Sequence, residues 1–339
     1  MTAMTLPSRT QALSRTTTTL LRDSLRVWWV LLRMMVPIMI AVKVAAEFGA
    51  IPYIAKAFAP VMDLAGLPAE VGVVWAAACL TTIYGAAAVL PTVLPDITMT
   101  TAQMTVLGTM VLVAHSLPVE GRVCQRAGAG IIAQTVLRLV GALVFGIILN
   151  AVYSGLDVLQ EPVTITWLPE SDPDAGWTGW AMDSLIGLGW IYLIILAIMT
   201  GMAVLEAIGA NRLLTYLLSP LLRFMGISER AVPLTVIGVL LGISYGGGLI
   251  IREVERGNVS RRDVLLSISF MALCHSLIED SLIIIALGGH WSGVIVGRLI
   301  LTLVVIAIIA RIIHRLPDAT LARLFLSRSA VPESAAPSA

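Results

Sequence analysis

Long apolar runs separated by short polar stretches make up most of this chain. Five runs approach or exceed the roughly 18–20 residues that a helix needs to cross the hydrocarbon of a membrane. These runs are Val27–Ala46, Val71–Leu90, Gly128–Val152, Leu185–Leu205 and Trp291–Ile313. The short alternating segments typical of a membrane barrel are not seen. The pattern predicts an all-α, polytopic helical membrane protein.

The apolar pattern occurs twice, with offsets between 159 and 161 residues. Matched positions, in chain order, are Glu47 and Glu206, Pro60 and Pro220, Gly66 and Gly226, Tyr84 and Tyr245, His115 and His275, and Arg138 and Arg298. Because six pairs keep one order, we interpret residues 20–155 and 181–326 as two homologous repeats. Around them lie a polar N-terminus (1–19) without the apolar core of a signal peptide, an acidic, Trp-containing linker (156–180) and a small-residue tail (327–339) expected to be disordered.

Basic residues in short loops indicate how each repeat is inserted. The first repeat has Arg22 and Arg26 before its first span, and the second has Arg311 and Arg315 after its last. Between the spans, the loops that contain arginine in one repeat have counterparts without arginine in the other. By the positive-inside rule this predicts inverted topology, with both termini cytoplasmic, in the bacterial inner (cell) membrane. We expect about 8–10 segments, including broken or re-entrant helices. Whether 51–64 and 211–225 cross the membrane stays open.

Bulk composition narrows the function classes. The chain is 58% hydrophobic and 13% charged, with mean hydropathy +0.93 and net charge +1. No basic run is interleaved with aromatic residues, so no nucleic-acid partner is expected. Cys79, Cys124 and Cys274 are scattered without a CxxC pair, which gives neither a disulfide framework nor a zinc motif.

Two short stretches carry costly polar residues beside apolar runs. Residues 114–122 read AHSLPVEGR and residues 274–281 read CHSLIEDS. Helical spacing pairs Ser116 with Glu120, Ser276 with Asp280, and His275 with Glu279, whose matching position is Val119. We expect His115, Ser116, Glu120, His275, Ser276, Glu279 and Asp280 to converge near the midplane and bind a solute or ion.

Another interpretation of the carboxylates stays open. Arg138 and Arg298 lie well inside the last span of each repeat and need partners at that depth. Glu120 and Asp280 are then structural ion-pair partners of these arginines rather than ligands of a solute.

Helix breaks are expected at corresponding places in both repeats. Pro118 disfavours helical geometry at the residue before it and lacks a backbone donor. Tyr84-Gly85 and Tyr245-Gly246-Gly247 indicate interruptions near the ends of their helices. Inverted-repeat transporters often build the solute site from such breaks, so these residues are candidates for gating.

Enzymatic activity is not expected. Ser116 and His115 are adjacent, and adjacent helical side chains point about 100° apart, so they cannot form a nucleophile–base pair. HExxH, GxSxG and phosphate-binding loops are missing from the sequence. The histidines and carboxylates have the right chemistry for a divalent transition ion, but the identity of any metal is unknown at this stage.

The two Gly-interrupted helices (TTIYGAAAVLP and GISYGGGLI) and the polar broken stretches resemble the nucleoside-recognition or Gate domain proteins. That superfamily includes portions of concentrative nucleoside transporters, of ferrous iron transporter B and of spore maturation proteins A and B. The resemblance implies inverted repeats, frequent homo-oligomers, and transport in some members. The cysteine-containing gate motifs of the iron transporters have no match here, and nucleoside-contacting residues cannot be carried over.

The leading expectation is a secondary transporter or permease of a small polar solute, nucleoside-like or ion-coupled, in the lipid bilayer. Its only cofactor would be a coupling proton or cation. Two alternatives stay open: a non-transporting membrane scaffold like the spore maturation proteins, and a divalent metal ion transporter.

Overall fold

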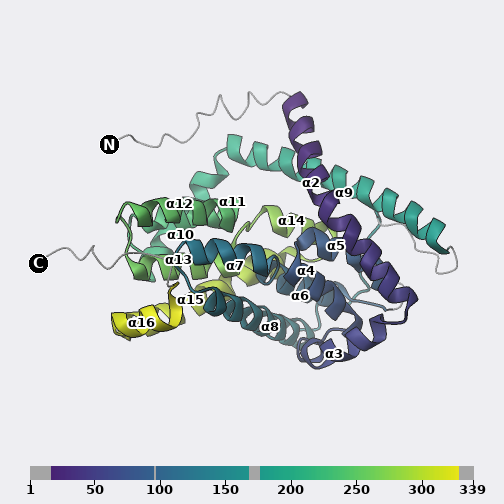
Figure 1. Ribbon diagram of the computed structural model, residues 1–339, viewed down its shortest axis with the longest axis horizontal. Helices are drawn as coiled ribbons and strands as arrows, with labels where there is room; N and C mark the ends of the chain where they lie inside the picture. Colours follow the sequence, from purple (N-terminus) through teal and green to yellow (C-terminus); the bar gives the residue numbers. More distant parts are fainter. Residues whose placement is uncertain (1–16, 95–96, 168–175, 328–339) are drawn as a thin grey trace, which may run out of the picture.

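The computed structural model describes residues 17–94, 97–167 and 176–327 (Figure 1). Among these residues every regular element is helical, and the only β contacts are two isolated bridges. This confirms the all-α fold class. Most of the 1–19 segment, part of the 156–180 linker and nearly all of the 327–339 tail lie outside the described residues. Side chains outside the description also include those of Ala210, Asn211, Ser244 and Tyr245.

The helices follow the same order in both halves. The first half contains α2 (Thr17–Glu47), α3 (Ile51–Leu64), η1 (Ala69–Val71), α4 (Gly72–Leu80), α5 (Ile83–Val93), α6 (Thr101–Val113), α7 (Leu117–Arg126) and α8 (Ile131–Gly155). The second contains α9 (Gly176–Ala207), α10 (Ala210–Phe224), α11 (Ala231–Leu241), α12 (Ile243–Glu255), α13 (Arg261–Cys274), α14 (Glu279–Ala286), the π-helix η4 (Ser292–Gly297), α15 (Arg298–Arg315) and α16 (Asp318–Phe325). Among the described residues, η1, η4 and α16 have no separate counterpart.

Left-handed backbone positions recur at the offset of the sequence repeat. Positive φ angles occur at matched positions in Gly49 and Gly209, Gly66 and Gly226, Ser116 and Ser276, and Gly128 and Gly288. Each pair is separated by 160 residues. Such conformations end helices and are costly for residues other than glycine. The two halves therefore share a backbone plan as well as a sequence pattern.

Within the described part of the chain, six helical units are long and apolar enough to cross a membrane. They are α2, α6–α7, α8, α9, α13–α14 and η4–α15. Helices α3 and α10 have 14 and 15 residues and reach only about 22 Å. Helix α3 could contribute to a seventh span only together with η1–α4, across a bend of 105°. Each half thus supplies three spans, an odd number, without requiring residues 51–64 or 211–225 to cross.

The helices between these spans fold back on themselves. Gly238 of α11 and Gly246 of α12 are so close that a Cβ on Gly246 would meet the Gly238 backbone. In a continuous helix these residues would lie about 12 Å apart, so the chain reverses between them. The reversal is at Gly242, where φ is 98°. Helix α4 packs against α5 in the same way, and we call α4–α5 and α11–α12 the two hairpins.

The position of the hairpin breaks corrects the sequence expectation. The first break is at Thr81–Thr82, where the Thr82 side chain accepts a hydrogen bond from the Gly85 amide at 3.3 Å. Tyr84-Gly85 and Tyr245-Gly246-Gly247 lie just beyond the breaks, within the second helix of each hairpin. Gly85 and Gly246 instead permit close packing, because a Cβ would meet Thr81 or Gly238.

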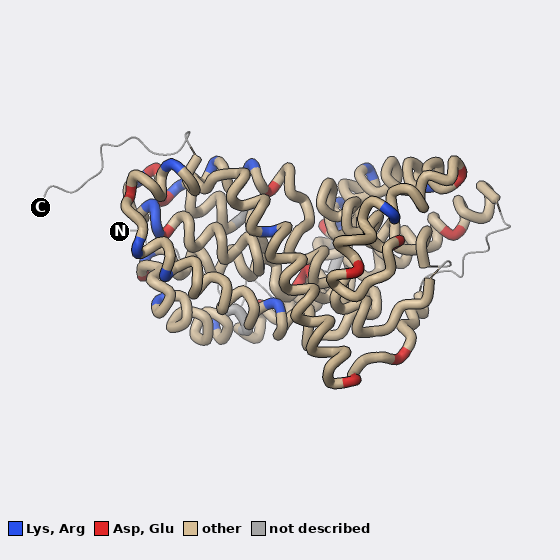
Figure 2. Tube along the Cα trace, turned by 90° about the horizontal axis from the view of Figure 1, so that it is seen from below, with Lys and Arg blue, Asp and Glu red and all other residues tan. Residues whose placement is uncertain are grey.

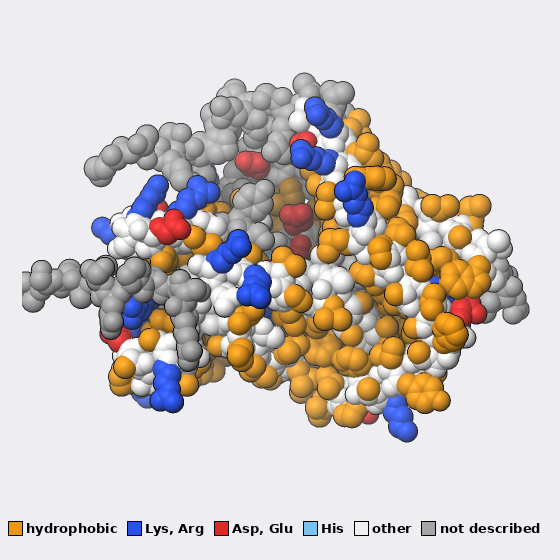
Figure 3. All heavy atoms as spheres, viewed as in Figure 1, with side chains coloured by type: hydrophobic (Ala, Val, Ile, Leu, Met, Phe, Trp, Pro, Cys, Tyr) orange, Lys and Arg blue, Asp and Glu red, His pale blue; other side chains and the backbone are white. Residues whose placement is uncertain are grey.

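The broken spans occupy the centre of the molecule. In α6–α7 and α13–α14, 78% and 72% of the most apolar window is buried, against 11–33% in the other four spans. Lys and Arg gather mainly at one end of the elongated molecule, and further charged residues lie near its middle (Figure 2). Apolar side chains cover much of the visible surface (Figure 3). A lipid-facing outer layer therefore surrounds a core made by α6 and α13.

Candidate functional site

Each quoted stretch interrupts a buried span at the same residue. Helix α6 ends at Val113, and Ser116 adopts the left-handed conformation (φ 51°) directly before α7. Helix α13 ends at Cys274, and Ser276 has φ 44°. Pro118 lies in the first turn of α7, where its missing amide costs nothing. Left-handed non-glycine residues store strain of order 1–3 kcal/mol and gather at functional sites. The break predicted from Pro118 is therefore present.

The breaks rest on the tips of the hairpins. Ser116 donates its hydroxyl to the Thr81 carbonyl and its amide to the Ala78 carbonyl, the latter at 2.9 Å. In the second half the Leu277 amide donates to the Val239 carbonyl at 2.8 Å. Each break is thus held by the hairpin of its own half.

These contacts correct the expected helical pairing. Ser116 and Ser276 stand outside the helices, so they do not share a helical face with Glu120 and Asp280. His275 has an extended backbone and is likewise not paired with Glu279. The Ser116 hydroxyl instead donates a hydrogen bond to the hairpin, at the Thr81 carbonyl. The Thr81 carbonyl was not predicted, because every residue carries a carbonyl and sequence gives no sign of its direction.

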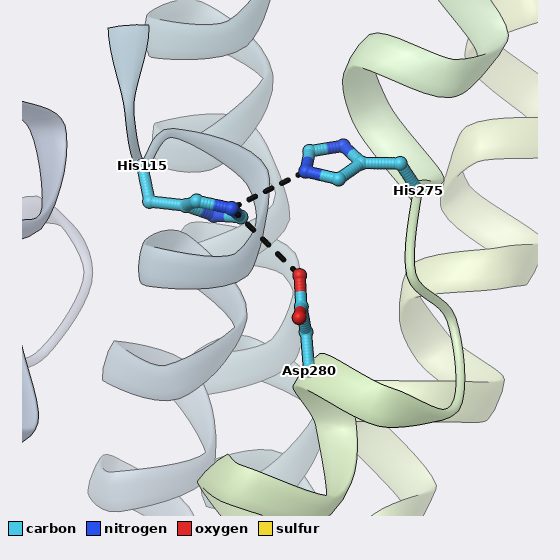
Figure 4. Close-up of side chains that lie close together, drawn as sticks. All are labelled: His115, His275 and Asp280. Carbon is cyan, nitrogen blue, oxygen red and sulfur yellow. Dashed lines mark hydrogen bonds and ion pairs between the residues drawn. The ribbon is translucent and has the colours of Figure 1, made fainter. Parts of the chain in front are cut away.

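His115 and His275 meet at the contact between the halves. Their Nε2 atoms are 3.2 Å apart although the residues are separated by 160 positions (Figure 4). Two equivalent residues can touch only close to the axis that relates their units. Trp28 shows the same relation, since its indole donates to the carbonyl of Leu188, also 160 residues away, at 2.9 Å. A pseudo-two-fold axis therefore passes between the two imidazoles.

Two carboxylates reach the imidazoles across this axis. Glu120 Oε1 is 3.3 Å from His275 Nε2, and the reciprocal contact joins Asp280 Oδ2 to His115 Nε2 at 3.7 Å. Glu120 Oε1 is also 3.5 Å from His115 Nε2. The side chains of these four residues are 2–13% exposed. We call His115, Glu120, His275 and Asp280 the axial cluster.

The axial cluster lacks a donor. His115 Nδ1 lies 3.1 Å from the Val111 carbonyl, and His275 Nδ1 lies 2.9 Å from the Met271 carbonyl. A carbonyl can only accept, so both Nδ1 atoms carry hydrogen, and each neutral ring presents a lone pair at Nε2. Two lone pairs and two carboxylate oxygens then converge with no hydrogen among them. The arrangement is complete only with a proton or a cation at its centre.

The two buried arginines differ in what they hold. Arg138 forms an ion pair with Glu120 at 2.5 Å and donates to the Val113 and His115 carbonyls, each at 2.7 Å. Arg298 donates to the His275 carbonyl at 3.2 Å, while its Nε and Nη1 have no hydrogen-bond partner among the described residues. The structural ion pair considered above is therefore present for Glu120, and no corresponding pair joins Arg298 to Asp280 within the described part of the chain.

A cavity of about 1690 Å³ reaches Glu279, the residue directly before Asp280 of the axial cluster. It lies between α9, α10, α11 and α12, and Tyr84 and Glu279 form part of its wall. Figure 3 shows this face hollowed, with acidic side chains inside. In the first half α2 packs closely on α5, whereas α9 makes no comparable contact with α12. The cavity exists because the two halves differ at this place.

The remaining predicted residues are divided between these features. Glu279 adjoins the axial cluster in sequence and faces the cavity. Gly247 gives α12 room beside Val123 of α7. The Tyr245 side chain lies outside the described residues. Four of the seven candidate binding residues therefore meet at the axis, and Glu279 lies on the cavity wall. Ser116 and Ser276 lie against the hairpins, the Ser276 hydroxyl beside Gly242.

Comparison with known proteins supports the membrane assignment. The chain is 26% identical over 264 residues to the "uncharacterized membrane protein YvoD" of Bacillus subtilis (strain 168). The aligned region covers 77% of this chain and 83% of that protein. No family model matches the chain, and no solved structure matches it. The chain is a membrane protein with several apolar helices.

Proposed function

We propose that this protein is a secondary transporter whose two halves exchange conformations around the axial cluster. The observation that carries this proposal is a cavity whose wall includes Glu279, next in sequence to Asp280 of the buried, pseudo-symmetric axial cluster. The cargo is a small polar solute or ion. The axial cluster binds it or binds a coupling proton or cation, because its four acceptors need a positive charge between them.

Unequal packing of equivalent helices supports two alternating states. Helix α2 packs against α5 of the first hairpin, whereas α9 makes no comparable contact with α12 of the second hairpin. If the halves exchange these arrangements, the present cavity closes and an equivalent one opens along α2 and α5. On the opposite side the linker covers the second half, where Trp167 donates to the Ala286 carbonyl at 2.7 Å.

Charge supports the direction in which the cavity faces. Its wall includes Arg212, Arg223 and Arg252, at the ends of α10 and α12. By the positive-inside rule these residues are cytoplasmic, so the structure is open toward the cytoplasm, and both termini lie there as well. Membership of the nucleoside-recognition (Gate) superfamily and the lack of enzymatic activity are parts of the same proposal.

One observation favours a second candidate, a non-transporting scaffold. The Arg138–Glu120 pair joins α8 to α7 and is almost fully buried, as a purely structural contact would be. In a scaffold the axial cluster would serve folding alone.

Proteoliposomes distinguish these functions. Wild-type protein is reconstituted with a pH-sensitive dye inside, a pH gradient is imposed, and nucleosides and small organic ions are added one class at a time. At least one class should dissipate the gradient or accumulate inside. Asp280→Asn should abolish this while the protein inserts normally, and Asp318→Asn, at an exposed carboxylate of α16 that is not part of the cavity wall, is the matched control. If no class is moved and Asp280→Asn lowers thermal stability in detergent, the scaffold replaces the transporter.

A further inference from the structure

We propose that the axial cluster binds one divalent first-row transition metal ion. His115, His275 and Asp280 each direct one ligand atom to a common centre, and these three atoms lie within 4.8 Å of one another. They come from the break before α7, the break before α14 and the first turn of α14 (Figure 4). Glu120 supplies a fourth oxygen on the same side as the imidazoles.

The spacing of these atoms agrees with a tetrahedral ion. Metal–nitrogen and metal–oxygen bonds of about 2.0–2.2 Å place neighbouring tetrahedral ligands roughly 3.3–3.6 Å apart. The pair of Nε2 atoms is separated by 3.2 Å, and Glu120 Oε1 lies 3.3 and 3.5 Å from them. Asp280 Oδ2 lies 3.7 Å from His115 Nε2. An ion bound by His115, His275 and Asp280 therefore requires only side-chain adjustments, since their ligand atoms lie within 4.8 Å of one another. Glu120, which also holds Arg138, is a further ligand through Oε1 only if it turns toward the ion.

The surroundings already orient the ligands. Metal-binding histidines usually donate their second ring nitrogen to a carbonyl or carboxylate, which fixes the ring and directs the free lone pair. Both histidines do so, toward the carbonyl four residues earlier. Arg138 holds the second oxygen of Glu120 and leaves Oε1 toward the imidazoles. These contacts orient the imidazoles and Glu120 as the ligands of a metal site must be oriented.

Ligand chemistry indicates the class of ion. Two imidazoles with two carboxylates suit Zn²⁺, Fe²⁺, Co²⁺ or Ni²⁺, whereas Mg²⁺ and Ca²⁺ take oxygen ligands almost alone. The thiolates that select Cu⁺ are not part of the cluster. Glu279 places a further carboxylate on the cavity wall, next in sequence to Asp280.

The role of the ion as cargo rests on the transport function proposed above, whereas its binding does not. The metal would bind equivalent residues of both halves at once, and the cavity would give it access from one side. Binding and flux can therefore be measured separately.

The binding experiment uses the full chain, purified without a histidine tag, in detergent. Co²⁺ is titrated and its visible ligand-field absorption is recorded, since four-coordinate Co²⁺ absorbs strongly. We expect one Co²⁺ per chain, displaced by Zn²⁺ and not by Mg²⁺. His115→Gln and His275→Gln should each weaken binding at least tenfold. His314→Gln is the matched control, because His314 lies at the far end of α15 beside Gly226 and should leave binding unchanged.

The site is overturned if the wild type shows no stoichiometric Co²⁺ binding, as expected if the cluster takes a proton alone. It is also overturned if a variant with both His115→Gln and His275→Gln binds Co²⁺ unchanged. If the variants fail to fold, X-ray absorption of the wild-type Co²⁺ complex decides, and a spectrum without two imidazoles overturns the site. Stoichiometric binding with no Co²⁺ flux in proteoliposomes keeps the site and overturns the metal as cargo. Flux of another solute without metal binding keeps the transporter and overturns the site.

Discussion

Arg138 and Arg298 occupy matched positions in the two halves, yet only Arg138 holds a carboxylate. Arg138 is bonded to Glu120 and to two carbonyls, and Arg298 is bonded to one carbonyl, with two donors unpartnered among the described residues. The less completely bonded arginine belongs to the second half, whose helices form most of the cavity wall. Two equivalent arginines therefore have different partners, as expected if the two halves are in different conformations.

The carboxylates should differ in what their loss does. Glu120→Gln leaves Arg138 as an unpaired buried charge, which typically costs about 3–5 kcal/mol. Asp280→Asn breaks no arginine pair in this conformation and should cost much less stability. Thermal unfolding of both variants in detergent measures the difference. Equal losses of stability would contradict the asymmetry seen here.

The arginines should show the same asymmetry. Arg138→Met leaves Glu120 as an unpaired buried carboxylate and should destabilise the protein by about 3–5 kcal/mol. Arg298→Met removes one hydrogen bond and should cost about 1–3 kcal/mol. We also expect Arg298→Met to stop transport, because the exchanged state needs Arg298 in the position that Arg138 has now. Unfolding curves and proteoliposome flux test the two parts, and a transporting Arg298→Met variant would refute the second.

Matched cysteines should reveal which side is open. Ile198 lines the cavity, and its counterpart Ile38 packs beside Gly85 in the closed half. The three native cysteines are buried, so they give a low background. In inverted vesicles Ile198→Cys should react with a membrane-impermeant maleimide, and in intact cells Ile38→Cys should not. Labelling of both positions from one side would rule out the proposed orientation.

Two glycines of α12 test the hairpin. At Gly246 a Cβ would meet the Gly238 backbone and Met271 Sδ, whereas at Gly248 nothing lies within 4 Å. Backbone cannot yield easily, so Gly246→Ala should destabilise the fold by about 1–3 kcal/mol. Gly248→Ala should be neutral or add up to about 1 kcal/mol of helix stability. The pair is compared by thermal unfolding; similar values would mean that the hairpin is not packed as described.

Sequence reasoning captured what depends on side-chain type and spacing. The repeat offset of 160 residues identified His115 and His275 as equivalent. The polar residues beside apolar runs predicted a candidate site at the interrupted spans. The hairpins were not predicted, because Thr81–Thr82 and Gly242 carry no periodic signal that separates a reversal from a kink. The Ser116 hydroxyl was assigned to the site because helical spacing was assumed across a residue that is left-handed. Recurrence of Gly49 with Gly209 and of Gly128 with Gly288 was the available sign of matched chain reversals.

The position of the axial cluster limits what its occupant can do. A small ion at the pivot between the halves meets the same kinds of group whichever half is open, so it binds both states alike. A ligand with equal affinity for two states shifts no equilibrium, however tightly it binds. Direction must then come from groups that have no counterpart. Glu279, matched by Val119, is such a group, and its carboxylate on the cavity wall is present in only one half.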